Sequence, residues 1–124
     1  MSEGGQLFLW GLRQWTTAIV CGGRAPVTVG RVLDFGEPKA FSLIAVFALL
    51  AARDADRPLT INPPCAAELS SDEWTLVRAL TAERACQRGA SAPLRGLIGA
   101  NPTESLMRAA AAVTQCFAAA GVAV

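Results

Sequence analysis

The chain contains no histidine, which removes the usual general base, the usual nitrogen ligand of zinc and the usual side chain that changes charge near neutral pH. Charged residues make up only 17% of the 124 residues, against about 25% in an average protein, and the net charge is +1. Eleven residues are basic, and because Lys39 is the only lysine, the other ten are arginines, scattered along the chain. A general nucleic-acid binder needs many basic groups on one face, so the sequence argues against nucleic acid as a partner.

Closely spaced cysteines are also absent. Cys21, Cys65, Cys86 and Cys116 all lie more than twenty residues apart. Zinc and iron–sulfur sites normally draw on close pairs such as C-x-x-C, because one turn then presents two thiolates to one metal. The sequence therefore predicts no metal site and no cofactor. Without a sign of export, which a disulfide would need, the cysteines are expected to be small buried hydrophobes.

No apolar run is long enough to cross a membrane. The run at 40–52 has thirteen residues and is broken by Ser42, whereas a span needs about twenty. The tail at 106–124 is longer, but it carries Arg108 and is mostly alanine, which inserts weakly. The start at 1–5 lacks the basic residues of a signal peptide. We therefore expect a soluble, cytoplasmic protein without a membrane span.

Apolar residues are abundant, at 52% of the chain. A chain of this length forms one domain, here residues 1–124. It buries roughly two-thirds of its unfolded surface and needs no disulfide or bound metal to fold. So many apolar residues with so few charges are more than one compact monomer covers easily. This excess favours an oligomer or a bound partner.

Glycines and prolines divide the chain into segments with helical periodicity, and no strand pattern lasts beyond four residues. Residues 38–54, which include the sequence AFSLIAVFALLAA, are apolar on every side, so this helix is expected to be central with neighbours all around it. The predicted fold is an all-α compact bundle of four main helices and two short ones around this central helix. The main helices are expected at about 6–21, 38–54, 70–89 and 101–121, and the short ones at 27–35 and 91–98.

The densest local pattern lies at 59–74. Residues 59–62 precede two prolines and are therefore expected to be extended. Ser70 and Glu73 form a capping box, in which each side chain bonds the backbone N–H of the other residue. Leu69 before the cap and Trp74 after it are placed to form a hydrophobic staple. The pattern predicts a helix beginning at this cap, while Asn101 with Pro102 predicts the cap of the last helix.

Cys65 stands at the centre of this pattern and has two interpretations. If it begins a turn of helix, nearby N–H groups lower the pKa of its thiol and make it a nucleophile or redox sensor. With no histidine, its base would be Glu68, Asp72 or Glu73, and Glu73 already serves the cap. The favoured interpretation is that Cys65 packs under the proline turn and fills space in the core. Cys65 is thus a weak catalytic candidate.

Trp10 is the candidate interface residue. It points away from the apolar stripe of the first helix, toward the side of Gln14 and Thr17. An aromatic side chain on the polar side of a helix often anchors an interface. The equal alternative is a tertiary contact with the tail at 121–124 or with another helix.

The segment 57–80 resembles a family of short helical bacterial proteins, a domain of unknown function. The residues that carry the likeness are Arg57, Pro58, Leu59, Pro64, Cys65, Leu69, Ser70, Asp72 and Glu73. The resemblance implies a helical fold type and no particular activity.

Three hypotheses of function remain. The first is a non-enzymatic helical module that binds itself, as a homodimer, or another protein. The second is a small thiol-based enzyme or redox sensor that uses Cys65. The third is a binder of a small apolar ligand, in a pocket lined by Trp15, Phe41, Phe47 and Trp74.

Overall fold

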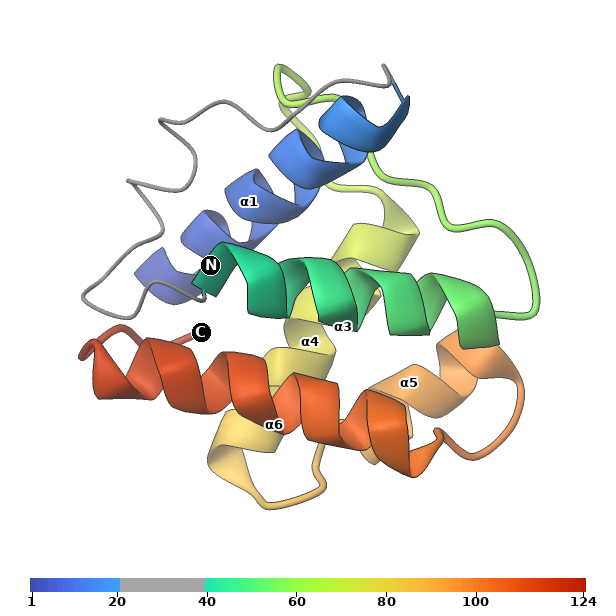
Figure 1. Cartoon of the computed structure of the whole chain (residues 1–124), viewed down its shortest axis with the longest axis vertical. Coiled ribbons are helices and arrows are strands. Elements are labelled where there is room, and N and C mark those ends of the chain that lie inside the picture. The colour runs from blue at the N-terminus through green and yellow to red at the C-terminus, as the bar shows by residue number, and fades with distance from the viewer. Residues whose placement is uncertain (21–39) are drawn as a thin grey trace.

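This computed structural model describes residues 1–20 and 40–124. In this part the chain forms five α-helices and no strand (Figure 1). The all-α prediction is confirmed for this part, and the short helix expected at 27–35 lies outside it. No helix among the described residues is long and apolar enough to cross a membrane. The helices are α1 (Glu3–Val20), α3 (Ala40–Asp54), α4 (Ser71–Ala85), α5 (Ser91–Ile98) and α6 (Glu104–Ala119).

The helices are arranged around α4 and α6. α6 packs against both α3 and α4, α5 packs against α4, and α1 contacts α3 and α4. In Figure 1, α3 and α6 run side by side and cross in front of α4. The two ends of the chain meet, because the N–H of Gly4 donates to the carbonyl of Ala123 at 2.9 Å. A Cβ at Gly4 would lie 2.1 Å from that carbonyl oxygen, so only glycine fits there.

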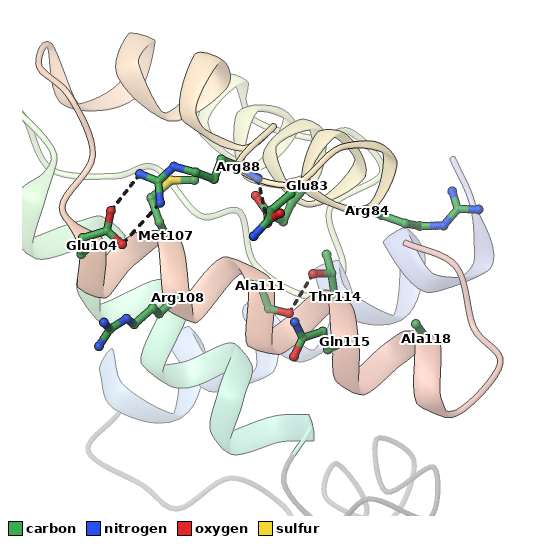
Figure 2. Close-up of a pocket in the computed structure, with 11 residues that line it drawn as sticks. Glu83, Arg84, Arg88, Glu104, Met107, Arg108, Ala111, Thr114, Gln115 and Ala118 are labelled. Atoms are coloured by element: carbon green, nitrogen blue, oxygen red, sulfur yellow. Dashed lines mark hydrogen bonds and ion pairs between the residues drawn. The ribbon is translucent and has the colours of Figure 1, made fainter.

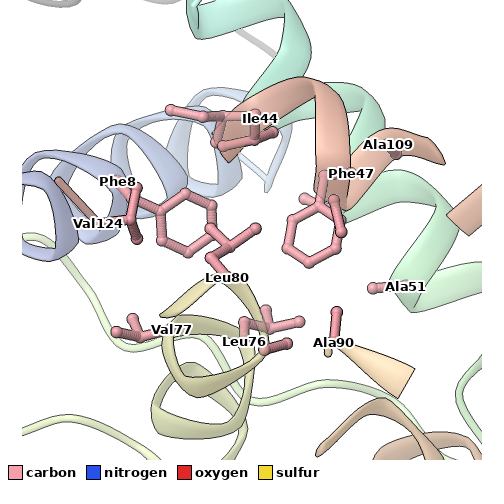
Figure 3. Packing of buried hydrophobic residues seen from close by; sticks show 14 of the residues in the cluster. Phe8, Ile44, Phe47, Ala51, Leu76, Val77, Leu80, Ala90, Ala109 and Val124 are labelled. Atoms are coloured by element: carbon pink, nitrogen blue, oxygen red, sulfur yellow. The ribbon is translucent and has the colours of Figure 1, made fainter. Parts of the chain in front are cut away.

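The core fills the space between α1, α3, α4 and α6 (Figure 3). The rings of Phe8 and Phe47 meet at its centre, with centroids 6.0 Å apart and a tilt of 54°. Figure 3 shows leucines of α4 below these rings and Ile44 above them. The inward faces of two helices are buried through Leu76, Val77 and Leu80 on α4, and through Leu106, Val113 and Phe117 on α6.

The predicted capping box begins α4 as expected. The Ser70 hydroxyl accepts from the N–H of Glu73 at 3.1 Å, and the Glu73 carboxylate accepts from the N–H of Ser70 at 2.8 Å. The predicted cap of the last helix is wrong. The N-cap is Thr103 instead of Asn101. Its hydroxyl accepts from the N–H of Leu106 at 3.2 Å, and the first residue of α6 is Glu104.

The short helix α5 spans the predicted residues, Ser91–Ile98. Its N-cap is Ala90, which offers no side-chain acceptor to the first turn. Gly99 ends the helix in the left-handed conformation, with φ 78°, and its N–H donates to the carbonyl of Arg95 at 2.8 Å.

Helix α3 is covered on one side only. Its inner face is buried through Ala40, Ile44, Phe47, Ala48 and Ala51. On the opposite side Val46 is 47% exposed and Leu49 is 56% exposed. The described residues therefore do not surround α3, and the expectation of neighbours all around it is not confirmed for this side.

Candidate functional site

A buried ion pair joins α1 to the start of α4. Arg13 donates from Nε to one carboxylate oxygen of Glu73 at 2.7 Å and from Nη2 to the other at 3.0 Å. Both side chains are buried. The hydrogen bond to Glu73 raises the pKa of Arg13 above its ordinary value, against the opposite effect of burial. This two-pronged geometry is the strongest form of ion pair available to a protein.

The same guanidinium holds the loop between α3 and α4. Its Nη1 donates to the carbonyl of Ala66 at 2.9 Å, and its Nη2 donates to the carbonyl of Glu68 at 2.8 Å. Glu73 accepts in addition from the N–H of Asn62 at 3.3 Å. One arginine and one glutamate therefore fix the loop against two helices.

A second ion pair fixes the beginning of that loop. Arg57 donates to both carboxylate oxygens of Asp72, at 2.8 and 2.6 Å, and the N–H of Thr60 donates to Asp72 at 2.7 Å. The hydrogen bonds from Arg57 hold the pKa of Asp72 below its ordinary value, although burial acts in the other direction. The carboxylate is buried, whereas the arginine is half exposed.

These contacts assign a structural role to the acids that sequence reasoning offered as bases. Asp72 and Glu73 each accept from a guanidinium and from backbone N–H groups. Within residues 1–20 and 40–124, no buried side-chain nitrogen or oxygen lacks a partner. A general base needs a free lone pair directed at its substrate, and these two carboxylates have theirs engaged. The polar residues of this region therefore hold the loop.

Cys65 lies on the surface of that loop, so the expectation that it fills space in the core is wrong. The turn that carries it is closed by the N–H of Ala66, which donates to the carbonyl of Pro63 at 3.0 Å. This turn keeps the thiol outside α4, whose first residue is Ser71. The electrostatic influence of Cys65 reaches Arg13, but the N–H groups of that guanidinium are directed at Glu73 and two carbonyls. The remaining acid, Glu68, is exposed.

The uncovered side of α3 is the candidate interaction site. We call it the outer strip and define it as Ser42, Val46, Leu49 and Arg53, all of them exposed. At 100° per residue these positions point away from the inner face. The half-buried Leu43 and Leu50 border the strip on one side, and Ala45 and Ala52 border it on the other. Arg53 is the only charge on the strip, and it donates to Asp54 at 2.8 and 3.2 Å.

Trp10, the predicted interface residue, is half-buried and packs against the core. It borders a surface hollow of about 340 Å³ together with Leu9, Pro64 and Leu69. These neighbours belong to α1 and to the loop before α4, and the interface role of Trp10 stays a prediction. Trp74 is the more exposed tryptophan, at 46%.

Trp74 borders a different hollow. With Met1, Val77 and Val124 it lines a depression of about 570 Å³ beside the joined ends of the chain. Met1 is 48% exposed, so this is the second place where large apolar side chains reach the surface of the described residues. This depression also contains two arginines, Arg78 and Arg84, whereas the outer strip contains Arg53 alone.

A groove of about 500 Å³ runs between α4 and α6 (Figure 2). Figure 2 shows Arg88 reaching across it to Glu104, with a closest distance of 2.8 Å. Glu83 accepts from the N–H groups of Arg88 and Ala90 and so closes the turn after α4. The groove mixes both signs of charge, and its acids are engaged within the chain, so it offers no concentrated charge to a ligand.

The four aromatic residues proposed for an apolar ligand do not share one cavity. Phe47 is fully buried in the core, and Trp74 lines the depression near the chain ends. Trp15 borders a separate hollow of about 270 Å³ with Leu12, Leu59 and other residues. Pockets for drug-sized ligands measure about 300–1,000 Å³, so this hollow is small.

Among residues 1–20 and 40–124, no three histidine, cysteine, aspartate or glutamate side chains are arranged to hold a metal ion. No known protein family, characterised protein or solved structure matches this chain.

Proposed function

We propose that this protein is a non-enzymatic helical module that binds another protein chain through the outer strip of α3. The observation that carries the proposal is the exposure of Val46 and Leu49, at 47% and 56%, in the middle of an otherwise packed helix. Burying a valine or leucine side chain completely stabilises a protein by about 1.5–3 kcal/mol. A partner that covers both Val46 and Leu49 would gain a substantial part of this free energy from each of the two side chains.

The surroundings of these two residues support a protein partner. Contiguous exposed apolar surface on a protein often marks an interaction site, and charged residues are depleted at the centre of interfaces. From Ala40 to Ala52, α3 carries no charge at all. The ordered polar contacts of the α4 start, in contrast, are used within the chain.

The test compares the double variant Val46→Glu/Leu49→Glu with wild type. Wild type cross-linked inside its native cells is expected to elute from a size-exclusion column as a complex larger than the monomer. The variant is expected to elute as a folded monomer, because the interface would bury unpaired carboxylates. Trp74→Glu is the matched control, since it places the same charge at another exposed apolar residue and should leave the complex intact.

Two results would contradict the proposal. One is a wild-type protein that elutes as a monomer after cross-linking inside its native cells. The other is a Trp74→Glu or Trp10→Glu variant that dissociates the complex while the α3 variant does not, since this would move the interface away from α3. Circular dichroism of each variant confirms that the helices are retained.

The second candidate function is a reactive thiol at Cys65, supported by the exposure of that side chain. Cys86 is exposed as well and serves as an internal control. A thiol function predicts that iodoacetamide alkylates Cys65 about tenfold faster than Cys86, because the thiolate is the reacting form. Equal rates would remove this candidate. The resemblance to a bacterial family of unknown function favours neither candidate.

A further inference from the structure

We propose that the partner is a second copy of this chain, and that the two α3 helices pack antiparallel with Val46 of one copy opposite Leu49 of the other. This inference rests on the proposed function and names its partner. Four features of α3 carry it: the spacing of the outer strip, the position of its charge, the size of its bordering residues and its area.

The spacing of the outer strip is that of a helix–helix seam. Its members lie four, three and four residues apart, at positions 42, 46, 49 and 53. This is the alternation that brings side chains to one seam in paired helices. The inner face repeats it at Ala40, Ile44, Phe47 and Ala51, which the rest of the chain covers. Helix α3 therefore has two seams, and its own chain occupies one.

The charge at the end of the strip decides the direction of packing. In a parallel pair each residue meets its own copy, so the two Arg53 guanidiniums, each paired with Asp54 of its own chain, would occupy the same end of the seam. In an antiparallel pair centred between Val46 and Leu49, each Arg53 lies opposite the hydroxyl of Ser42 in the other copy. The two arginines are then roughly 16 Å apart along the axis, at 1.5 Å per residue.

The residues that border the strip also fit a two-fold antiparallel pair. In this geometry each border of one helix meets the same border of its copy. The side with Ala45 and Ala52 therefore meets alanines, which let the helices approach closely. The side with Leu43 and Leu50 meets leucines, which extend the apolar contact. Large residues thus gather on one side of the seam and small residues on the other.

The area of the strip sets the expected strength. A stable interface buries about 800 Å² on each partner, and the exposed side of a single four-turn helix provides less. We therefore expect a concentration-dependent dimer rather than a permanent one. The equilibrium should move from monomer toward dimer as the protein concentration is raised, which sedimentation equilibrium measures.

A charge-pair experiment tests the partner and the register together. The single variants Val46→Glu and Leu49→Lys should each weaken dimerisation at least about tenfold, because each places an unpaired charge opposite an apolar residue. Mixing the two variants in equal amounts should restore a heterodimer. The carboxylate introduced at position 46 of one chain then faces the ammonium introduced at position 49 of the other, while the unchanged Leu49 and Val46 still meet. Ala92→Glu, at an exposed position of α5, should dimerise like wild type.

The outcomes separate this inference from the proposed function. The purified wild-type chain could stay monomeric at every concentration while its native complex still depends on the outer strip. This result would overturn the proposal that the partner is a second copy, and it would leave the proposed interaction module in place. Two variants that dissociate without restoring a heterodimer on mixing would overturn the antiparallel register. The milder variant Val46→Ser is used if Val46→Glu loses helicity, and it should still weaken the dimer.

Discussion

The start of α4 and the outer strip of α3 differ in which side chains are buried and which are exposed. At the start of α4, charged side chains are buried and each has a partner, as in the Arg13–Glu73 pair with its 2.7 and 3.0 Å contacts. On the outer strip, apolar side chains are exposed and no described part of the chain covers them, as with Leu49 at 56% exposure. The protein thus places charge inside and apolar surface outside at two sites a short distance apart in the sequence.

The contrast shows which region is complete within one chain. Removing a charge from water costs several kcal/mol unless paired groups compensate, so a buried pair with every hydrogen bond made belongs to the folded monomer. Exposed valine and leucine leave hydrophobic free energy unused, which a partner can recover. The start of α4 therefore serves the fold, whereas the outer strip is available for binding. The following changes test this division, beginning with the one expected to have the largest effect.

Arg13→Ala should lower the free energy of unfolding by about 3–5 kcal/mol, because it leaves the Glu73 carboxylate buried without its cation. Chemical denaturation measures the loss. The matched control is Arg88→Ala, which breaks the pair with Glu104; those side chains are 58% and 63% exposed, and the expected loss is at most about 1 kcal/mol. Equal losses in the two variants would show that burial of the Arg13 pair does not matter.

Phe47→Ala should cost about 3–5 kcal/mol, since Phe47 is fully buried and its removal leaves a cavity beside Phe8. Val46→Ala, one residue away on the outer strip, should cost the monomer less than about 1 kcal/mol. Thermal melts at low protein concentration, where any dimer is dissociated, make the comparison. A similar loss in both variants would mean that α3 is covered on both sides.

Ser70→Ala should cost about 1 kcal/mol, because it removes the oxygen that accepts from the N–H of Glu73 at the start of α4. The hydroxyl also donates to the carbonyl of Thr60, so the loop loses a contact too. Ser71→Ala, the neighbouring exposed position inside the helix, should leave the melting curve unchanged. A Ser70→Ala melting curve equal to that of wild type would mean that the cap contributes no stability.

Arg57→Gln should have the smallest effect, and it should depend on pH. The pKa of Asp72 is lower in the folded chain than in the unfolded one, chiefly because of Arg57. The unfolded state therefore binds the proton more readily. The stabilisation is fully present above the unfolded pKa near pH 4 and is lost as the pH falls through the folded value.

Without Arg57, this part of the acid sensitivity should shrink. At pH 7 the variant should be less stable than wild type by about 1 kcal/mol or less, because the arginine is half exposed. The difference should narrow on acidification below about pH 4. Urea titrations at several pH values measure it, and a gap that widens in acid would contradict the assignment.

Local signals predicted much of the fold. The capping box at Ser70, the end of α5 at Gly99 and the inward faces of α4 and α6 follow from contacts within one or two turns. The cap of α6 was misplaced because Asn101 and Thr103 are both good capping residues, and only the final backbone path chooses between them. The position of Cys65 was wrong for a similar reason, since a turn after two prolines carries no local sign of which side faces water.

The candidate sites were harder to predict. Arg13 and Glu73 are 60 residues apart, so nothing local connects them. One signal was present: Arg13 follows Leu12 and lies four residues after Leu9, which places a charge on the apolar side of α1 and calls for a buried partner. Similarly, the sequence of α3 has apolar residues on all sides of the helix, and it does not indicate which side stays exposed.

The sequence by itself determined that the described part of this protein is helical, the approximate position of each described helix, and that its residues offer no histidine-based chemistry. These properties depend on composition and on contacts between residues a few positions apart. Only the tertiary structure decided that Glu73 serves Arg13, that Cys65 faces solvent and that Val46 and Leu49 are exposed while Phe47 is buried. Each of these depends on how distant helices pack, because burial and pairing are properties of the neighbours that the fold brings together.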